Sequence, residues 1–160
     1  MTAMLKNTKG EIYVLICVFV LVIMIVFSVI FTYASIITDV KVQKTNTEIV
    51  FDSFVSNNSI IIYNNIKQGK NATDGVDTSK FRTSLKEFCT FVEKDGKYYS
   101  IDADGSEKFN MTVPEMGFIE DEKLELYVTF TMNIPIRFAG KTVQTAHIPV
   151  KVTSELTKIN

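Results

Sequence analysis

Glycine and proline are missing from an unusually long part of this 160-residue chain. Neither occurs between residues 11 and 68, and residues 12–38 also lack any charged side chain. Because these two residue types most often interrupt a helix, nothing in the stretch requires a break. The uncharged part is mostly Ile, Val, Leu and Phe, and it exceeds the roughly 20 residues that cross a bilayer core. We therefore expect one long helix that starts in a membrane and continues beyond it.

Residues that carry chemistry are also scarce. The chain has no tryptophan and one histidine, His147, which alone cannot supply the usual ligands of a zinc site. The two cysteines, Cys17 and Cys89, are expected in different compartments, so we expect no intrachain disulfide. There is no glycine-rich phosphate loop and no nucleophile elbow, and a net charge of −1 gives no electrostatic basis for binding nucleic acid. We expect no enzyme, no cofactor, no small-molecule substrate and no nucleic-acid partner.

The first ten residues contain two lysines and no acid. Positive charge beside a span stays on the cytoplasmic side, which predicts a single-pass protein of the cell membrane with a cytoplasmic N-terminus and an extracytoplasmic C-terminal domain. The apolar run is longer than the core of a cleaved signal peptide, so a retained anchor is favoured. The expected segments are a head or leader (1–10), a transmembrane helix (11–38), a helical stem (39–68) and an α+β ectodomain (69–160).

Over residues 35–68 the apolar residues take a helical spacing. The expected a/d stripe comprises Ile37, Val40, Phe51, Phe54 and Ile61, with Lys44, Thr47 and Asn58 interrupting it. These interruptions favour packing of the stem on its own domain or on neighbouring subunits over an independent coiled coil. Gly69 is the expected end of the helix.

A polar loop over residues 68–80 is followed by a predicted short helix. Thr78 or Ser79 is the expected N-cap, and Phe81, Leu85 and Phe88 share the expected apolar face. Further on, Asp95-Gly96 predicts a two-residue hairpin turn. Residues 102–107 superficially resemble a calcium loop but lack its later ligands, so a plain turn is favoured. A strand is expected over residues 108–113.

The clearest strand signal is the alternation of residues 124–138, followed by a second strand after a turn at Ala139-Gly140-Lys141. A three-residue loop would place both apolar sets on one face. Pro135 and Pro149 cannot donate to a ladder and indicate an edge or a bulge. The segment 127–137 is a hypothetical edge for a partner strand. The face expected toward the stem comprises Leu126, Val128, Phe130, Met132, Ile134, Ile148, Val150 and Val152.

These features predict an α+β protein: a long N-terminal helix, first transmembrane and then amphipathic, followed by a small antiparallel sheet packed on the stem. The short basic head ends in Lys9-Gly10, and the apolar helix starts at once with Glu11. This layout resembles the pilin-like proteins, and the Gly-Glu-x-Tyr opening with a long terminal hairpin resembles the TadE-type minor pilins or pseudopilins of the Tad branch of type IV pilus systems in Gram-positive bacteria.

The resemblance implies a processing site at Lys9, Gly10 and Glu11 for a prepilin peptidase. It also implies, besides the lipid bilayer, other pilin-like subunits, an assembly ATPase and platform proteins as partners. Type IV pilins usually carry a glutamate at the fifth residue after the cut, where this chain has Leu15. That departure favours an accessory or assembly role over a bulk filament subunit. The alternative hypothesis is a membrane-tethered extracytoplasmic binding module unrelated to pili.

Overall fold

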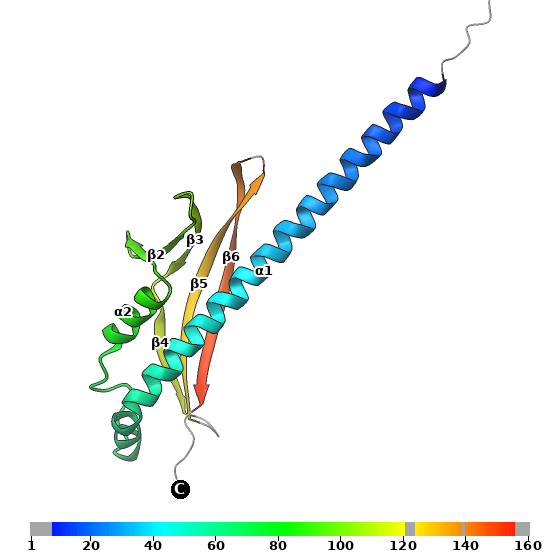
Figure 1. Ribbon diagram of the computed structural model, residues 1–160. Helices are drawn as coiled ribbons and strands as arrows, with labels where there is room; N and C mark the ends of the chain where they lie inside the picture. The colour runs from blue at the N-terminus through cyan, green and yellow to red at the C-terminus, as the bar shows by residue number, and fades with distance from the viewer. Residues whose placement is uncertain (1–7, 121–123, 139, 156–160) are drawn as a thin grey trace, which may run out of the picture. The chain divides into compact units, whose positions relative to one another are not determined.

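The computed structural model describes residues 8–120, 124–138 and 140–155 (Figure 1). It is an α+β protein in which helix α1 (Thr8–Lys67) precedes a curled antiparallel sheet, as the sequence predicts. The helix begins at Thr8, so it includes Lys9 and Gly10, which were expected in the head. The chain divides into two compact units, Met1–Thr38 and Asp39–Asn160. Each unit includes part of α1, and the 29 residues from Asp39 to Lys67 are the stem.

In the first unit, the apolar part of α1 presents its side chains outward. Every side chain from Ile12 to Phe31 is exposed. Among the described residues, α1 is the helix that is long and apolar enough to cross a membrane. Two of its hydroxyl groups are satisfied within the helix: Thr32 Oγ1 donates to the Ser28 carbonyl oxygen at 2.8 Å, and Thr38 Oγ1 donates to the Ala34 carbonyl oxygen at 2.9 Å. Internal satisfaction of polar groups is what a bilayer core demands.

The second unit contains a six-stranded antiparallel sheet within the described residues. Strand β5 lies at its centre, pairing with β6 on one side and with β4 and β3 in succession on the other, and β2 and β1 continue the sheet beyond β3. The strands are β1 (Val92–Lys94), β2 (Lys97–Ile101), β3 (Glu107–Thr112), β4 (Glu115–Glu120), β5 (Leu124–Phe138) and β6 (Lys141–Glu155).

The hairpin of β5 and β6 has the predicted even-with-even pairing, but a shorter loop and a bulge produce it instead of a three-residue loop. Phe138 pairs with Lys141, so the connection has two residues and not the expected three. A register shift then leaves Val143 of β6 without a partner, between the pairs Arg137–Thr142 and Ile136–Gln144. This bulge adds one residue to β6 and restores even-with-even pairing, because a one-residue shift reverses the face of every later side chain. Val143 itself is 70% exposed.

Helix α2 (Thr78–Phe88) follows the loop after α1. Its N-cap is Asp77, whose carboxylate accepts from the Ser79 backbone N–H, so the prediction of Thr78 or Ser79 as cap was wrong. Asp77 is the better cap because its extended backbone leaves the carboxylate free to accept from the first helical turn. Phe81 and Leu85 are buried as expected, but Phe88 is 54% exposed because it lies in the last turn of α2, where the chain leaves the helix.

The predicted turns are present. Asp95 and Gly96 both have positive φ angles, 51° and 67°, which a type I′ hairpin turn requires. Gly69, at φ 65°, follows the end of α1. The segment after β2 is a turn in which Asp102 N–H donates to the Ser106 carbonyl oxygen at 2.8 Å. Strand β3 starts at Glu107, one residue earlier than expected.

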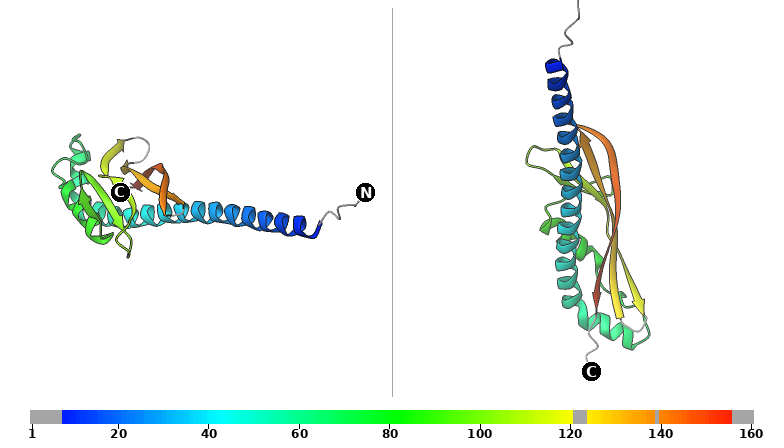
Figure 2. Two further views of the ribbon diagram at one scale, coloured as in Figure 1. Left: turned by 90° about the horizontal axis from the view of Figure 1, so that it is seen from above. Right: turned by 90° about the vertical axis from the view of Figure 1, so that its right-hand side faces the viewer.

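The stem contributes a buried stripe to the core of the second unit. Within this unit, the stem and α2 lie on one side of the sheet, and the opposite side is open (Figures 1 and 2). Phe81 of α2 joins the two helices, with ring centroids 5.5 Å from Phe51 and 5.7 Å from Phe54. Ile61, placed on the stripe by the sequence, is 43% exposed, whereas Thr47, expected to interrupt it, is fully buried. The buried members of the stripe are Gln43, Thr47, Val50, Phe51, Phe54, Val55 and Ile62.

Candidate functional site

The predicted processing residues lie at the very start of the membrane helix. Lys9, Gly10 and Glu11 belong to the first turns of α1, so the peptide bond after Gly10 is helical in this structure. Leu15, which occupies the position of the glutamate typical of type IV pilins, is 70% exposed on the apolar surface. The remainder of the predicted head, residues 1–7, lies outside the described residues.

Two tyrosines bracket the most apolar part of α1. Tyr13 and Tyr33 are 70% and 66% exposed, and they lie 20 residues apart. At 1.5 Å per residue this separation is about 30 Å, the thickness of a bilayer hydrocarbon core. Tyrosine concentrates at membrane–water interfaces because its ring is apolar and its hydroxyl is polar. The spacing therefore marks the two interfaces of a candidate single membrane span.

Almost all of the sheet residues predicted to face the stem are buried in the second unit. Ile148 is half-buried, and the other seven are buried: Leu126, Val128, Phe130, Met132, Ile134, Val150 and Val152. Five of those seven belong to β5 and two to β6, where Val128 pairs with Val152 and Phe130 with Val150. Their burial makes this face the core of the second unit, and the surface available to a partner lies elsewhere.

An ion pair joins the first stem residue to the sheet. The Lys108 ammonium lies 2.7 Å from an Asp39 carboxylate oxygen, and the two side chains are 41% and 15% exposed. Lys108 belongs to β3, so the pair fixes the membrane-proximal end of the stem to a strand of the same unit. A partly buried pair is screened by salt less than an exposed one.

A small buried polar cluster adjoins this end of the stem. Thr47 Oγ1 donates to the Gln43 carbonyl oxygen at 2.8 Å, and Gln43 Nε2 lies 3.6 Å from the Cys89 sulfur. Burial raises the pKa of the Cys89 thiol, against smaller opposing effects of hydrogen bonds with Gln43 and Asn46. A raised pKa disfavours the reactive thiolate. Cys89 is therefore suited to packing, and both cysteines are free thiols.

The open face of the sheet carries a ladder of polar side chains across three strands. Asn110 Nδ2 donates to Glu107 Oε1 at 2.7 Å, and Asn133 Nδ2 donates to Asn110 Oδ1 at 2.7 Å. His147 Nδ1 lies 2.6 Å from Asn133 Oδ1. Because that amide oxygen is an acceptor, Nδ1 carries the proton and Nε2 is left at the end of the ladder. The ladder organises the open face into a polar surface.

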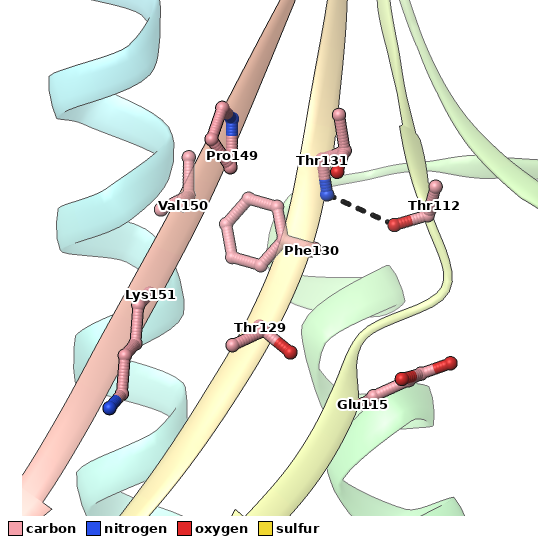
Figure 3. A pocket seen from close by; sticks show the side chains of 8 residues that line it. All are labelled: Thr112, Glu115, Thr129, Phe130, Thr131, Pro149, Val150 and Lys151. Atoms are coloured by element: carbon pink, nitrogen blue, oxygen red, sulfur yellow. Dashed lines mark hydrogen bonds between the residues drawn. The ribbon is translucent and has the colours of Figure 1, made fainter.

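Next to the ladder is a recess of about 400 Å³ (Figure 3). It forms where β3 ends at Thr112 and the chain departs from β5 before β4 begins at Glu115. The Thr131 backbone N–H, left without a strand partner there, donates to Thr112 Oγ1 at 3.0 Å. The lining residues are Thr112, Glu115, Thr129, Phe130, Thr131, Pro149, Val150 and Lys151.

The strand edge that could accept a partner is only partly where the sequence placed it. Residues 127–129 and 132–133 of the segment 127–137 pair with strands on both sides of β5, so the expectation of an edge was wrong for this part. Residues 134–137, which include Pro135, pair only with β6 among the described residues. In the described part of the chain, β6 pairs only with β5 and has a free side. The Thr131 N–H points away from β6, so the nitrogen of its partner, Pro149, faces that free side. A proline cannot donate, and it protects the edge from strand addition.

A second recess, of about 550 Å³, lies between the stem and α2 within the second unit. Ile49 and Phe88, 52% and 54% exposed, supply its apolar surface, and Lys80 lies among its polar lining residues. Sequence periodicity did not predict it, because Phe88 was assigned to the buried face of α2. Among the residues described, there is no group of three or more His, Cys, Asp or Glu side chains placed to hold a metal ion.

Comparisons with known proteins do not add a relative. No protein-family model matches the chain, and neither a curated protein nor a solved structure is significantly similar to it.

Proposed function

We propose that this protein is a single-pass, pilin-like structural or assembly component of a Tad-type pilus or secretion apparatus. Its N-terminus would lie in the cytoplasm and its α+β domain outside the cell membrane. The supporting observation is the continuity of α1: an exposed apolar helix passes without a break into a stem that forms part of the core of the outer domain. Such a helix would anchor the domain in the membrane.

The partners proposed on this basis are the lipid bilayer, other pilin-like subunits, platform proteins with their assembly ATPase, and a prepilin peptidase. Lys9 and Gly10 would form the peptidase signal and Glu11 the new N-terminus. Leu15 in place of the family glutamate supports an accessory or assembly role. The mechanism is lateral packing of helices, which in lipid depends on close contact between side chains.

The test is the N-terminus of the mature chain, measured by mass spectrometry of membranes from the native host. A chain that starts at Glu11 supports the proposal, and Gly10→Leu should then leave the leader attached. Lys70→Leu, a substitution after α1, is the matched control and should be processed normally. An intact Met1 in the native protein would contradict processing, and a start beyond Ala34 would remove the anchor.

The second candidate is a membrane-tethered extracytoplasmic binding module. The open polar face of the sheet supports it, because the recess beside Thr131 combines hydroxyl groups with the side chains of Glu115 and Lys151. An intact N-terminus, together with normal assembly of surface structures in a deletion strain, would favour this candidate.

A further inference from the structure

The open face of the sheet carries two rows of long side chains with a floor of short ones between them. Cross-strand partners project from the same face, so the register places Asn133 and His147 in one row and Lys151 in the other. The two rows are four residues apart on β6, which is about 13 Å at the usual rise of a strand. Between them lie the direct partners Thr131 and Pro149, whose short side chains leave the recess of about 400 Å³ (Figure 3).

The first row is the polar ladder, and all its hydrogen bonds run in one direction. The Asn110 amide donates to the Glu107 carboxylate, and the Asn133 amide donates to Asn110. His147 Nδ1–H then donates to Asn133, which leaves Nε2 of the neutral ring as an acceptor. Among the described residues, Nε2 has no hydrogen-bond partner. The ladder therefore holds an exposed acceptor in a fixed orientation, and a ligand must supply the donor.

The floor of the recess offers hydroxyl groups and one apolar ring. Thr112, Thr129 and Thr131 line it, and a threonine hydroxyl can both donate and accept. Pro149 is exposed beside them. The Thr131 backbone N–H, uncovered where β3 departs, is already bonded to Thr112 Oγ1. Side chains therefore determine what can bind, and they suit a ligand that combines many hydroxyl groups with an apolar face.

The charges around the recess favour a neutral ligand. Glu115 of β4 and Lys151 of β6 are both exposed and flank the recess from the two strands that pair with β5. One acid and one base offset each other, so the floor attracts neither anions nor cations over the other. The Lys151 ammonium also lies 4.6 Å from the centroid of the Tyr127 ring, which holds it beside that ring. A phosphate-rich or a polybasic partner is therefore disfavoured.

We infer that this face binds a neutral carbohydrate, with a pyranose ring over Pro149 and a sugar hydroxyl donating to His147 Nε2. A sugar has the required chemistry, because its ring carries hydroxyl groups at the edge and C–H groups on its faces. His147 and Pro149 project from the same face about 7 Å apart, a distance that one sugar ring bridges. The recess, of about 400 Å³, falls within the roughly 300–1,000 Å³ typical of small-ligand sites. This site goes beyond the proposed assembly role and is compatible with either candidate function, because it needs only the outer domain.

The test is titration of the fluorescently labelled full-length protein with soluble oligosaccharides, followed by thermophoresis. The detergent must have no sugar head group, since such a group would compete for the recess. The probes are neutral oligosaccharides of glucose, mannose, galactose and N-acetylglucosamine, with heparin as a sulfated polyanion. We expect saturable binding of at least one neutral series at about 1 mM or below. Binding of heparin alone, or of no neutral series up to about 10 mM, would overturn the inference.

Two substitutions test the site with little change in shape. Thr131→Val replaces a floor hydroxyl by a methyl group, and His147→Phe keeps a flat ring without its nitrogens. Each should weaken binding of the responding oligosaccharide about tenfold, the effect of one lost hydrogen bond. Thr153→Val is the matched control, because it removes an exposed hydroxyl from the same face of β6 outside the recess, and it should change the affinity less than about twofold.

Equal losses for Thr131→Val and Thr153→Val would overturn the inference, as would full affinity in both site variants. Thermal midpoints close to that of the native chain show that the variants are folded. The proposed function is tested separately by processing after Gly10, so failure of the carbohydrate site would leave it in place.

Discussion

The phenol ring of Tyr127 lies across Gly117, its direct partner on the neighbouring strand β4. A β-carbon at Gly117 would overlap the tip of this ring. On its other flank, Lys151 Nζ lies 4.6 Å from the centroid of the same ring, a cation–π contact. Glycine is therefore needed at position 117 because the ring occupies the space of a side chain, and no unusual backbone angle is involved.

A double-mutant cycle measures this relationship. Gly117→Ala should lower the free energy of unfolding by about 1 kcal/mol, because the new methyl group displaces the Tyr127 ring from its position against β4. With Tyr127→Ala in place, the same substitution should be neutral or stabilising, since glycine is disfavoured in strands. We expect a coupling energy of about 1–2 kcal/mol from unfolding followed by circular dichroism in detergent. Additive effects of the two substitutions would contradict the packing described.

The ion pair between Asp39 and Lys108 should contribute more than the exposed pair between Lys86 and Glu93. Asp39→Ala should destabilise the chain by about 1 kcal/mol, because the carboxylate is only 15% exposed and anchors the stem to β3. Glu93→Ala, which removes a contact of 3.2 Å at 49% exposure, should cost less than about 0.5 kcal/mol. Both are read from thermal unfolding of the full-length chain.

The two ion pairs should also differ in how strongly salt weakens them. Raising the salt concentration should weaken the contribution of the Lys86–Glu93 pair more than that of Asp39–Lys108, because exposed charges are screened more strongly. Equal losses for Asp39→Ala and Glu93→Ala at every salt concentration would contradict a special role for the first stem residue.

The terminal hairpin offers a core residue and an exposed residue for comparison. Leu126 is fully buried, so Leu126→Ala should cost about 3 kcal/mol through lost burial and an unfilled cavity. Val143 is the extra residue of the bulge and is 70% exposed, so Val143→Ala should change stability by less than about 0.5 kcal/mol. Denaturant unfolding of both variants is the measurement, and a similar cost for the two would contradict the assigned faces.

Periodicity and turn residues predicted most of the fold. The uninterrupted run before Gly69 predicted α1, Asp95-Gly96 predicted the first hairpin, and the alternation of β5 predicted its buried face. These signals are local, because each depends on neighbouring residues in the chain. The bulge at Val143 was not predicted, because a two-residue loop with a bulge and a three-residue loop without one bury the same side chains of β5 and β6.

Features that depend on tertiary packing could not be predicted in the same way. Thr47 and Gln43 are polar, so their burial could not be inferred from hydrophobic spacing, and it becomes clear only where the stem meets Cys89. The central position of β5 was not predicted, because its neighbour β4 has Gly117 in its middle and its sequence gives only a weak indication of a strand. The polar ladder to His147 also joins residues far apart in the sequence, and no sequence motif predicts it.

Acid should remove the advantage of Asp77 as the N-cap of α2. The hydrogen bond from the Ser79 side chain is the largest cause that lowers the pKa of the Asp77 carboxyl from its ordinary value of 3.8. A lowered pKa in the folded state means that the charged carboxylate stabilises folding above pH 3.8, and that this contribution disappears as the pH falls through the folded-state value. Asp77→Asn keeps a capping oxygen without the charge.

The difference in thermal midpoint between the native chain and Asp77→Asn should therefore be constant from pH 7 to pH 5 and shrink on acidification to pH 2.5. Asp104, whose pKa is lowered by the Ser106 backbone N–H, titrates in the same range but is present in both proteins, so its effect cancels. Asp104→Asn is the matched control, because it should show its own loss with acid while α2 keeps its cap. A difference between the native chain and Asp77→Asn that stays constant to pH 2.5 would mean that the carboxylate charge contributes nothing to the cap.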